Sequence, residues 1–177
     1  MQITDDQLHL ISPVIPVGTS GDLNSILGLI SASTVQRAAL CIGQFCIESD
    51  YFRVMTEDPA SYSGRSYVPY FGRDWIQLTW QTNYQACGDA IGVDLVSNPD
   101  VALQHNPEVC SWFWNSHNLN RFADANDCDG CTRAINGPKA DSASLTLRAK
   151  YYNRALNVLN GVTDPNFVDV VGGSSSV

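Results

Sequence analysis

Glutamate is scarce in this chain, and two of its three glutamates lie in opposite chemical surroundings. Glu48 continues the apolar face of a helical pattern in which Phe45 and Cys41 lie one and two turns earlier. A carboxyl among apolar and aromatic groups is desolvated, which favours its neutral form and lets it act as a proton donor. Glu57 stands between polar residues just before Pro59, so we expect it to lie in a wet loop and to stay ionised. This contrast is typical of an acid and base pair.

Helix geometry limits how the two glutamates can meet. On one continuous helix they would face opposite ways, after about 900° of rotation, and lie about 13 Å apart along the axis. The helix must therefore end soon after Glu48, and the Ser49-Asp50-Tyr51 step permits the chain to fold back. Two carboxyls about 6.5–9.5 Å apart suit inverting glycoside hydrolysis. The alternative is structural: Glu48 as a helix-end carboxylate bonded to a core arginine, and Glu57 as a merely solvated side chain.

The elements that position these residues are mainly helices. Thr4 can cap a short helix over 4–11, and Ser33 with Gln36 forms a capping box that opens the strongest helix. Strand-like alternation is scarce, and turn residues punctuate a loop or small β-hairpin region near 60–78. The pattern predicts a mainly α domain over 1–171, followed by a flexible Gly/Ser tail at 172–177. The other helices are expected at 22–31, 79–91, 107–115, 123–135 and 142–160.

The six cysteines are interpreted as structural, either buried or disulfide-bonded, and they can pair in 15 ways. Cys128-x-x-Cys131 has no further zinc ligands at suitable spacing and no thioredoxin-like context. His9, His105 and His117 are scattered. We therefore expect no metal site and no other cofactor.

Composition excludes several classes of partner. The chain has 177 residues, 44% of them hydrophobic and 16% charged, with a net charge of −8. An acidic chain without a basic run is a poor nucleic-acid binder, and no apolar stretch is long enough to insert in a membrane. The N-terminus lacks the cationic and apolar regions of a signal peptide. We expect a monomer of ordinary single-domain size.

Two motifs resemble family 19 of the glycoside hydrolases, which includes class I-type chitinases and many phage endolysins. The first runs from Gln44 through Glu48-Ser49 and Phe52-Arg53 to Glu57 and resembles the family's "Q-x-x-H-E-S-G-G-F-R…E" segment. The second runs from Gly72-Arg73 through Ile76-Gln77-Leu78-Thr79 to Asn83-Tyr84 and resembles "G-R-G-x-I-Q-L-T-x-x-x-N-Y". The resemblance extends over about 36–159. Further matches follow in the family's order: Ile91 to Leu95, Asn98-Pro99, Trp112 to Trp114, Ile135 to Gly137, and Arg148 with Tyr151-Tyr152.

The resemblance implies a lysozyme-like, two-lobed helical fold that inverts the β-1,4 linkage beside an N-acetylated sugar. Carried over, Glu48 is the general acid and Glu57 the general base, and the hydroxyl of Thr79 helps hold the attacking water. Arg148 organises the charge network of the acid. The substrate contacts implied are Gln77, Asn83 and Asn136. Local capping hydrogen bonds are the alternative role for the side chains of Gln77, Thr79 and Asn83.

The chain departs from the family pattern around both motifs. Ile47 replaces a histidine beside the acid, Asp50 and Tyr51 replace a Gly-Gly pair, and Asp74 replaces a glycine. Asp74 is expected to add negative charge near the cleft and so to perturb the base. These changes leave open a non-catalytic, glycan-binding relative.

Two polymers fit the implied chemistry, peptidoglycan and chitin. The short chain and its "Met-Gln-Ile-Thr-x-x-Gln-Leu" opening resemble phage endolysins, which are made in the host cytoplasm and act at the cell wall after release. We therefore expect a peptidoglycan-cleaving lysozyme with a role in host lysis and antimicrobial activity. The alternative is a chitinase acting through the same residues, because Thr79-Trp80 resembles the chitinase version of the signature and several cysteines suit a secreted enzyme.

Overall fold

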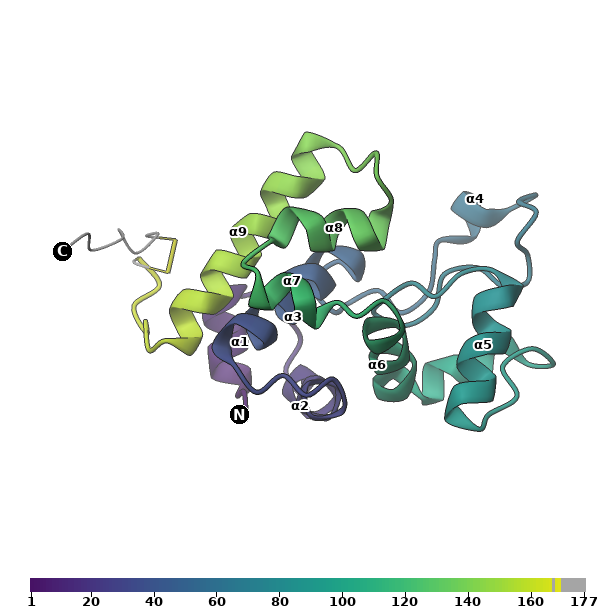
Figure 1. The fold of residues 1–177 in the computed structure, drawn as a ribbon, viewed down its shortest axis with the longest axis horizontal. Helices are drawn as coiled ribbons and strands as arrows, with labels where there is room; N and C mark the ends of the chain where they lie inside the picture. The colour runs from purple at the N-terminus through teal and green to yellow at the C-terminus, as the bar shows by residue number, and fades with distance from the viewer. Residues whose placement is uncertain (167, 170–177) are drawn as a thin grey trace.

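Helices dominate the computed structural model, which describes residues 1–166, 168 and 169 (Figure 1). The predicted mainly α fold is confirmed, and the expected tail at 172–177 lies outside the described residues. The helices are α1 (Asp5–Ile11), α2 (Thr19–Leu29), α3 (Val35–Glu48), α4 (Pro59–Tyr62), α5 (Gln81–Ile91), the 3₁₀ helix η1 (Pro99–Gln104), α6 (Asn106–Ser116), α7 (Asn120–Asp124), α8 (Cys128–Asn136) and α9 (Ser142–Leu159).

Side-chain caps set several helix ends. Thr4 caps α1 and exchanges hydrogen bonds with Gln7, as a capping box requires. The N-cap of α3 is Thr34, one residue after the predicted Ser33, because the side chain of Thr34 accepts from the backbone N–H of Arg37 at 3.2 Å. The single helix expected over 123–135 is two helices, since the chain turns at Asn126 with a positive φ of 53° before α8 begins.

The centre of the fold is the pair α3 and α9, which lie along each other. Helix α3 is buried from Ala38 to Cys46. Gly43 permits the close approach, because a Cβ at that position would lie 2.7 Å from the backbone nitrogen of Tyr152. The pairing brings the C-terminal end of α3 beside Arg148, which is the contact that the site depends on.

Two lobes are visible in Figure 1. Helices α1, α3, α7, α8 and α9 gather in one lobe, whereas α4, α5 and the intervening loop lie in the other. Helix α6 lies between them and contacts both α2 and α5. Within the described residues, no helix is long and apolar enough to cross a bilayer.

The segment expected to form a small β-hairpin contains only two isolated antiparallel bridges. These are Thr56 with Arg73 and Arg73 with Leu78. Positive φ angles at Asp74 and Gln77, 64° and 54°, turn the backbone sharply after Arg73 and interrupt any longer ladder. The result is a tight turn that carries Gln77 and Thr79 toward the end of α3.

Candidate active site

The chain reverses direction immediately after Glu48, as the sequence required. The hydroxyl of Ser49 donates to the carbonyl of Phe45 at 2.7 Å and accepts from the backbone N–H of Phe52 at 2.9 Å. Asp50, Tyr51 and Phe52 all have positive φ angles, between 45° and 64°. Two of these three residues replace the family's Gly-Gly pair, so this chain reaches a glycine-like backbone conformation with side chains that adopt it at a cost.

Glu48 lies at the end of α3 with its side chain only 14% exposed. Its Oε1 accepts from Nη2 of Arg148 at 2.5 Å, and the arginine side chain is 3% exposed. Burial raises the pKa of Glu48, and the charge and hydrogen bond of Arg148 partly offset the rise. The carboxyl therefore keeps its proton to a higher pH than an exposed glutamate.

Arg148 is itself held by Gln44, which is held in turn by Thr132, and the sequence reasoning selected neither side chain. Its Nη1 donates to Oε1 of Gln44 at 2.8 Å, and Nε2 of Gln44 donates to the hydroxyl of Thr132 at 3.1 Å. Gln44 and Thr132 are fully buried. The spacing could have identified Gln44, because it lies one helical turn before Glu48 on the same face.

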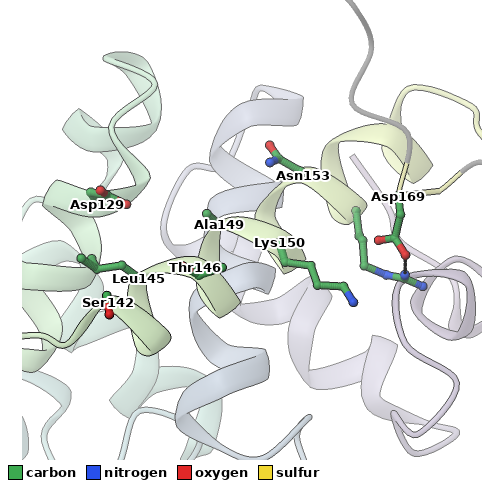
Figure 2. A pocket seen from close by; sticks show the side chains of 9 residues that line it. Asp129, Ser142, Leu145, Thr146, Ala149, Lys150, Asn153 and Asp169 are labelled. Atoms are coloured by element: carbon green, nitrogen blue, oxygen red, sulfur yellow. Dashed lines mark hydrogen bonds and ion pairs between the residues drawn. The ribbon is translucent and has the colours of Figure 1, made fainter.

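A pocket of about 360 Å³ opens in front of Glu48. It brings together Glu48, Gln77, Thr79 and Asn83, four of the residues predicted for the site. The remaining lining is largely apolar: Ile76, Leu78, Trp80, Phe113, His117, Ala134 and Ile135. A larger hollow of about 680 Å³ lies on the outer face of α9 and is lined instead by residues such as Lys150, Arg154 and Asp169 (Figure 2).

The polar side chains of the pocket make the local hydrogen bonds that the alternative interpretation expected. The hydroxyl of Thr79 donates to the carbonyl of Gln77 at 2.8 Å, and Nδ2 of Asn83 donates to the carbonyl of Thr79 at 2.8 Å. Nε2 of Gln77 donates to the carbonyl of Asp74 at 2.9 Å. In each of these bonds the side chain is the donor. The lone pairs of the Thr79 hydroxyl and the side-chain carbonyl of Asn83 therefore stay available to accept from a ligand.

Glu57 lies on the loop before α4, outside the lining of this pocket, and is half-buried and hydrogen-bonded rather than simply wet. Its Oε1 accepts from the hydroxyl of Tyr67 at 2.8 Å, and its Oε2 accepts from the backbone N–H of Gly72 at 3.0 Å. The backbone N–H of Glu57 also donates to the carbonyl of Gly72 at 2.8 Å. Sequence reasoning missed Tyr67 as a partner of this carboxylate.

Asn136 and Asp74 lie differently from what the sequence suggested. Asn136 is exposed at the end of α8 and donates to the hydroxyl of Ser144 at 3.4 Å, whereas its neighbour Ile135 lines the pocket. Asp74 is fully buried, and neither carboxyl oxygen has a hydrogen-bond partner. Burial raises the pKa of Asp74 to about 8, against a smaller lowering effect of Arg73. The negative charge expected near the cleft is therefore mostly absent at neutral pH.

The cysteines are all free thiols, and five of them are buried. Burial raises the pKa of the Cys87 thiol to about 12 and that of Cys128 to about 11, so both stay protonated near neutral pH. Among the described residues, no group of three or more His, Cys, Asp and Glu side chains is placed to hold a metal ion.

Comparison with known sequences places this site in a recognised context. The model of the family described as "Chitinase class I" matches residues 30–168. "Chitinase 8" of Oryza sativa subsp. japonica is 38% identical over 98 residues, which is 52% of this chain and 35% of the rice protein. "Endochitinase 2" of Gossypium hirsutum is 37% identical over 98 residues and is covered to 30%. The chain thus spans about a third of the length of these curated relatives.

Solved structures share the whole fold. Chitinase C from Streptomyces griseus HUT6037 has a TM-score of 0.72 at 25% identity, over 93% of this chain and 79% of that one. A bacterial family 19 chitinase, 22% identical, has a TM-score of 0.70 over 93% of this chain and 97% of its own. The two-lobed helical arrangement in Figure 1 is therefore the fold of these chitinases.

Proposed function

This chain belongs to the class I chitinase family, family 19 of the glycoside hydrolases, and on that premise we propose that it hydrolyses the β-1,4 linkages of chitin. The observation that carries the proposal is the position of Glu48. Its desolvated carboxyl, paired with Arg148, borders an open pocket that also contains Thr79 and Asn83. A glutamate with only a structural role at the end of a helix would be explained by its ion pair with an arginine. It would have no reason to border an open pocket.

Glu48 is the proposed general acid. Burial raises its pKa and so favours its protonated form, and it delivers its proton to the glycosidic oxygen as the bond from that oxygen to the anomeric carbon breaks. Arg148 then stabilises the carboxylate that forms, because its guanidinium already contacts Oε1. Gln44 keeps the guanidinium in place through both stages.

Glu57 is the proposed general base, with Thr79 as its partner in holding water. As the oxygen of water bonds to the anomeric carbon from the opposite face, Glu57 takes one of its protons, so the configuration inverts. The hydroxyl of Thr79 donates its hydrogen to the carbonyl of Gln77. The lone pairs of the Thr79 oxygen therefore point away from that carbonyl and can accept a hydrogen bond from the water. The carbonyl oxygen of Asn83 is free in the same way to accept the N–H of an acetamido group.

The family match favours chitin over the peptidoglycan that the sequence first suggested. The named relatives are chitinases, and both polymers present β-1,4-linked N-acetylhexosamines to the same groups. The net charge of −8 also provides no long-range attraction to anionic peptidoglycan. A role in cell-wall lysis after release from a host cytoplasm requires peptidoglycan as the substrate, so it belongs to that alternative only.

The test is product analysis on both polymers. Purified protein is incubated with N-acetylglucosamine hexamer and, separately, with peptidoglycan, and the products are identified by mass spectrometry. Fresh products of the hexamer are followed by proton NMR to assign the anomer released. We expect shortened oligomers that start as the inverted anomer, and intact peptidoglycan.

Variants at the two glutamates assign the roles. Glu48→Gln is expected to lower turnover by at least about 100-fold with the fold unchanged, because an amide cannot protonate the leaving oxygen. Glu108→Gln, on the exposed first turn of α6, is a matched control that should keep full activity. Muropeptides from intact peptidoglycan, with the hexamer untouched, would reverse the substrate assignment. Full activity of Glu48→Gln would show that Glu48 is not the general acid.

A further inference from the structure

We propose that Tyr67 is the positioning residue of the general base, so that it fixes the orientation of the Glu57 carboxylate. The inference rests on the proposed function, because it assigns a role to a residue that touches Glu57 rather than the substrate. Tyr67 belongs to neither of the two motifs that relate this chain to its family.

The contacts of Glu57 show how its carboxylate is oriented. The Tyr67 hydroxyl donates to one oxygen at 2.8 Å, and the backbone N–H of Gly72 donates to the other at 3.0 Å. Two donors on two different oxygens fix both the plane and the rotation of the carboxylate. Each oxygen keeps a further lone pair, so a water can still be accepted by the oriented group.

Tyr67 is itself held against the wall of the pocket. Its ring meets the ring of Trp80 edge to face, with centroids 5.2 Å apart, and Trp80 lines the pocket that contains Glu48. The surrounding residues 63–66 and 68–69 are exposed, whereas Tyr67 is half-buried. The ring therefore turns inward from an exposed segment, and its hydroxyl connects the base to the aromatic side of the pocket.

The hydrogen bond also has an electrostatic consequence. Donation to Glu57 raises the pKa of Tyr67, so the phenol remains a donor across the working pH range. In return, the phenol stabilises the ionised carboxylate, which is the form that accepts a proton from water. Removing the hydroxyl should leave the carboxylate held only by the backbone N–H of Gly72, and so free to rotate.

The experiment compares kcat and KM of Tyr67→Phe and Tyr62→Phe on N-acetylglucosamine hexamer. Tyr62 is the last residue of α4, five positions before Tyr67, and it stacks on Phe71, so its substitution removes a hydroxyl from the same part of the chain. We expect Tyr67→Phe to lower kcat roughly 10-fold, a part of the 10²–10⁴-fold that a general base supplies, with KM within about 2-fold. Tyr62→Phe should keep both kcat and KM of the wild type.

A double-mutant cycle with Glu57→Gln separates positioning from direct action. If Tyr67 acts through Glu57, adding Tyr67→Phe to Glu57→Gln should change kcat by less than about 2-fold. The same 10-fold loss in both backgrounds, or an unchanged kcat of Tyr67→Phe, would overturn the inference while leaving the glycosidase intact. If Glu57→Gln were as active as the wild type, the assignment of Glu57 as general base would be wrong, and so would the inference about Tyr67. No turnover by the wild type on either polymer would instead reject the proposed function itself.

Discussion

Replacing Asp74 with asparagine is expected to stabilise the protein at neutral pH and to weaken the pH dependence of its stability. Asp74 is fully buried, with both carboxyl oxygens unpartnered, and burial raises its pKa to about 8. In the unfolded chain the same group titrates near 3.8. Between these two values the folded protein must bind a proton that the unfolded chain has released, so its free energy of unfolding falls as pH rises.

The size of the effect follows from the gap between the two pKa values. Each unit corresponds to about 1.36 kcal/mol, so the ionisation of Asp74 costs nothing below pH 3.8 and about 6 kcal/mol in full above pH 8. Between pH 5 and pH 7 the wild type should lose about 3 kcal/mol through this residue. The asparagine of Asp74→Asn cannot ionise, keeps the size of the side chain and tolerates the left-handed backbone at φ 64°.

The assay is urea unfolding of wild type and Asp74→Asn at pH 5 and pH 7, at constant ionic strength. The stability of the variant relative to wild type should increase by about 3 kcal/mol between the two pH values, because contributions common to both proteins, including that of Glu48, cancel. For a chain of this size that difference corresponds to about 5–10 °C in Tm. Asp6→Asn, on the exposed first turn of α1, controls for loss of one negative charge.

Equal differences between wild type and Asp74→Asn at the two pH values would refute the reasoning. That result would mean that the carboxyl is ionised in the folded protein at both values, and hence that it is hydrated or partnered in solution. A variant less stable than wild type by the same amount at both pH values would lead to the same conclusion.

Three further predictions concern helices α2 and α3. Ser31→Gly should stabilise the fold by about 1 kcal/mol in urea unfolding, because Ser31 follows the C-cap residue of α2 with a φ of 55°, a position and conformation that favour glycine. A loss of stability would contradict this. Gly43→Ala should lower stability by about 1–3 kcal/mol, since its Cβ would meet the backbone of Tyr152 at 2.7 Å, and an unchanged Tm would show that α9 can shift. Gln44→Leu should cost about 1–3 kcal/mol and lower kcat, because it removes the buried side-chain acceptor at 2.8 Å from Nη1 of Arg148; normal kcat would show that the remaining contacts of the arginine are enough to position it.

Local patterns in the sequence were enough for much of the fold. The capping box at Thr4 and the apolar face of α3 are set by residues within one or two turns of each other, so their structure can be read from spacing. The reversal after Glu48 followed from helix geometry together with the hypothesis that Glu48 and Glu57 converge. The segment near 60–78 was less predictable, because its turns depend on positive φ angles at residues other than glycine.

The missing parts of the site are contacts between distant segments. Gln44 reaches Arg148 across 104 residues of sequence, and Tyr67 reaches Glu57 from an exposed loop whose path no local pattern fixes. Asp74 was expected to add charge because a carboxylate is normally exposed, and only the packed structure shows it buried without a partner. Spacing therefore singled out Glu48 as the proposed acid, whereas the groups that contact it and Glu57 became visible only in three dimensions.

The ion pair between Glu48 and Arg148 also determines when the end of α3 can acquire its partner during synthesis. The two residues are 100 positions apart, and α9 is the last helix of the described chain. A nascent polypeptide presents Glu48 long before Arg148 exists, so this carboxyl has no counter-ion and α3 has no α9 to pack against until α9 has been synthesised. The order of synthesis therefore makes the surroundings of Glu48 a late product of folding.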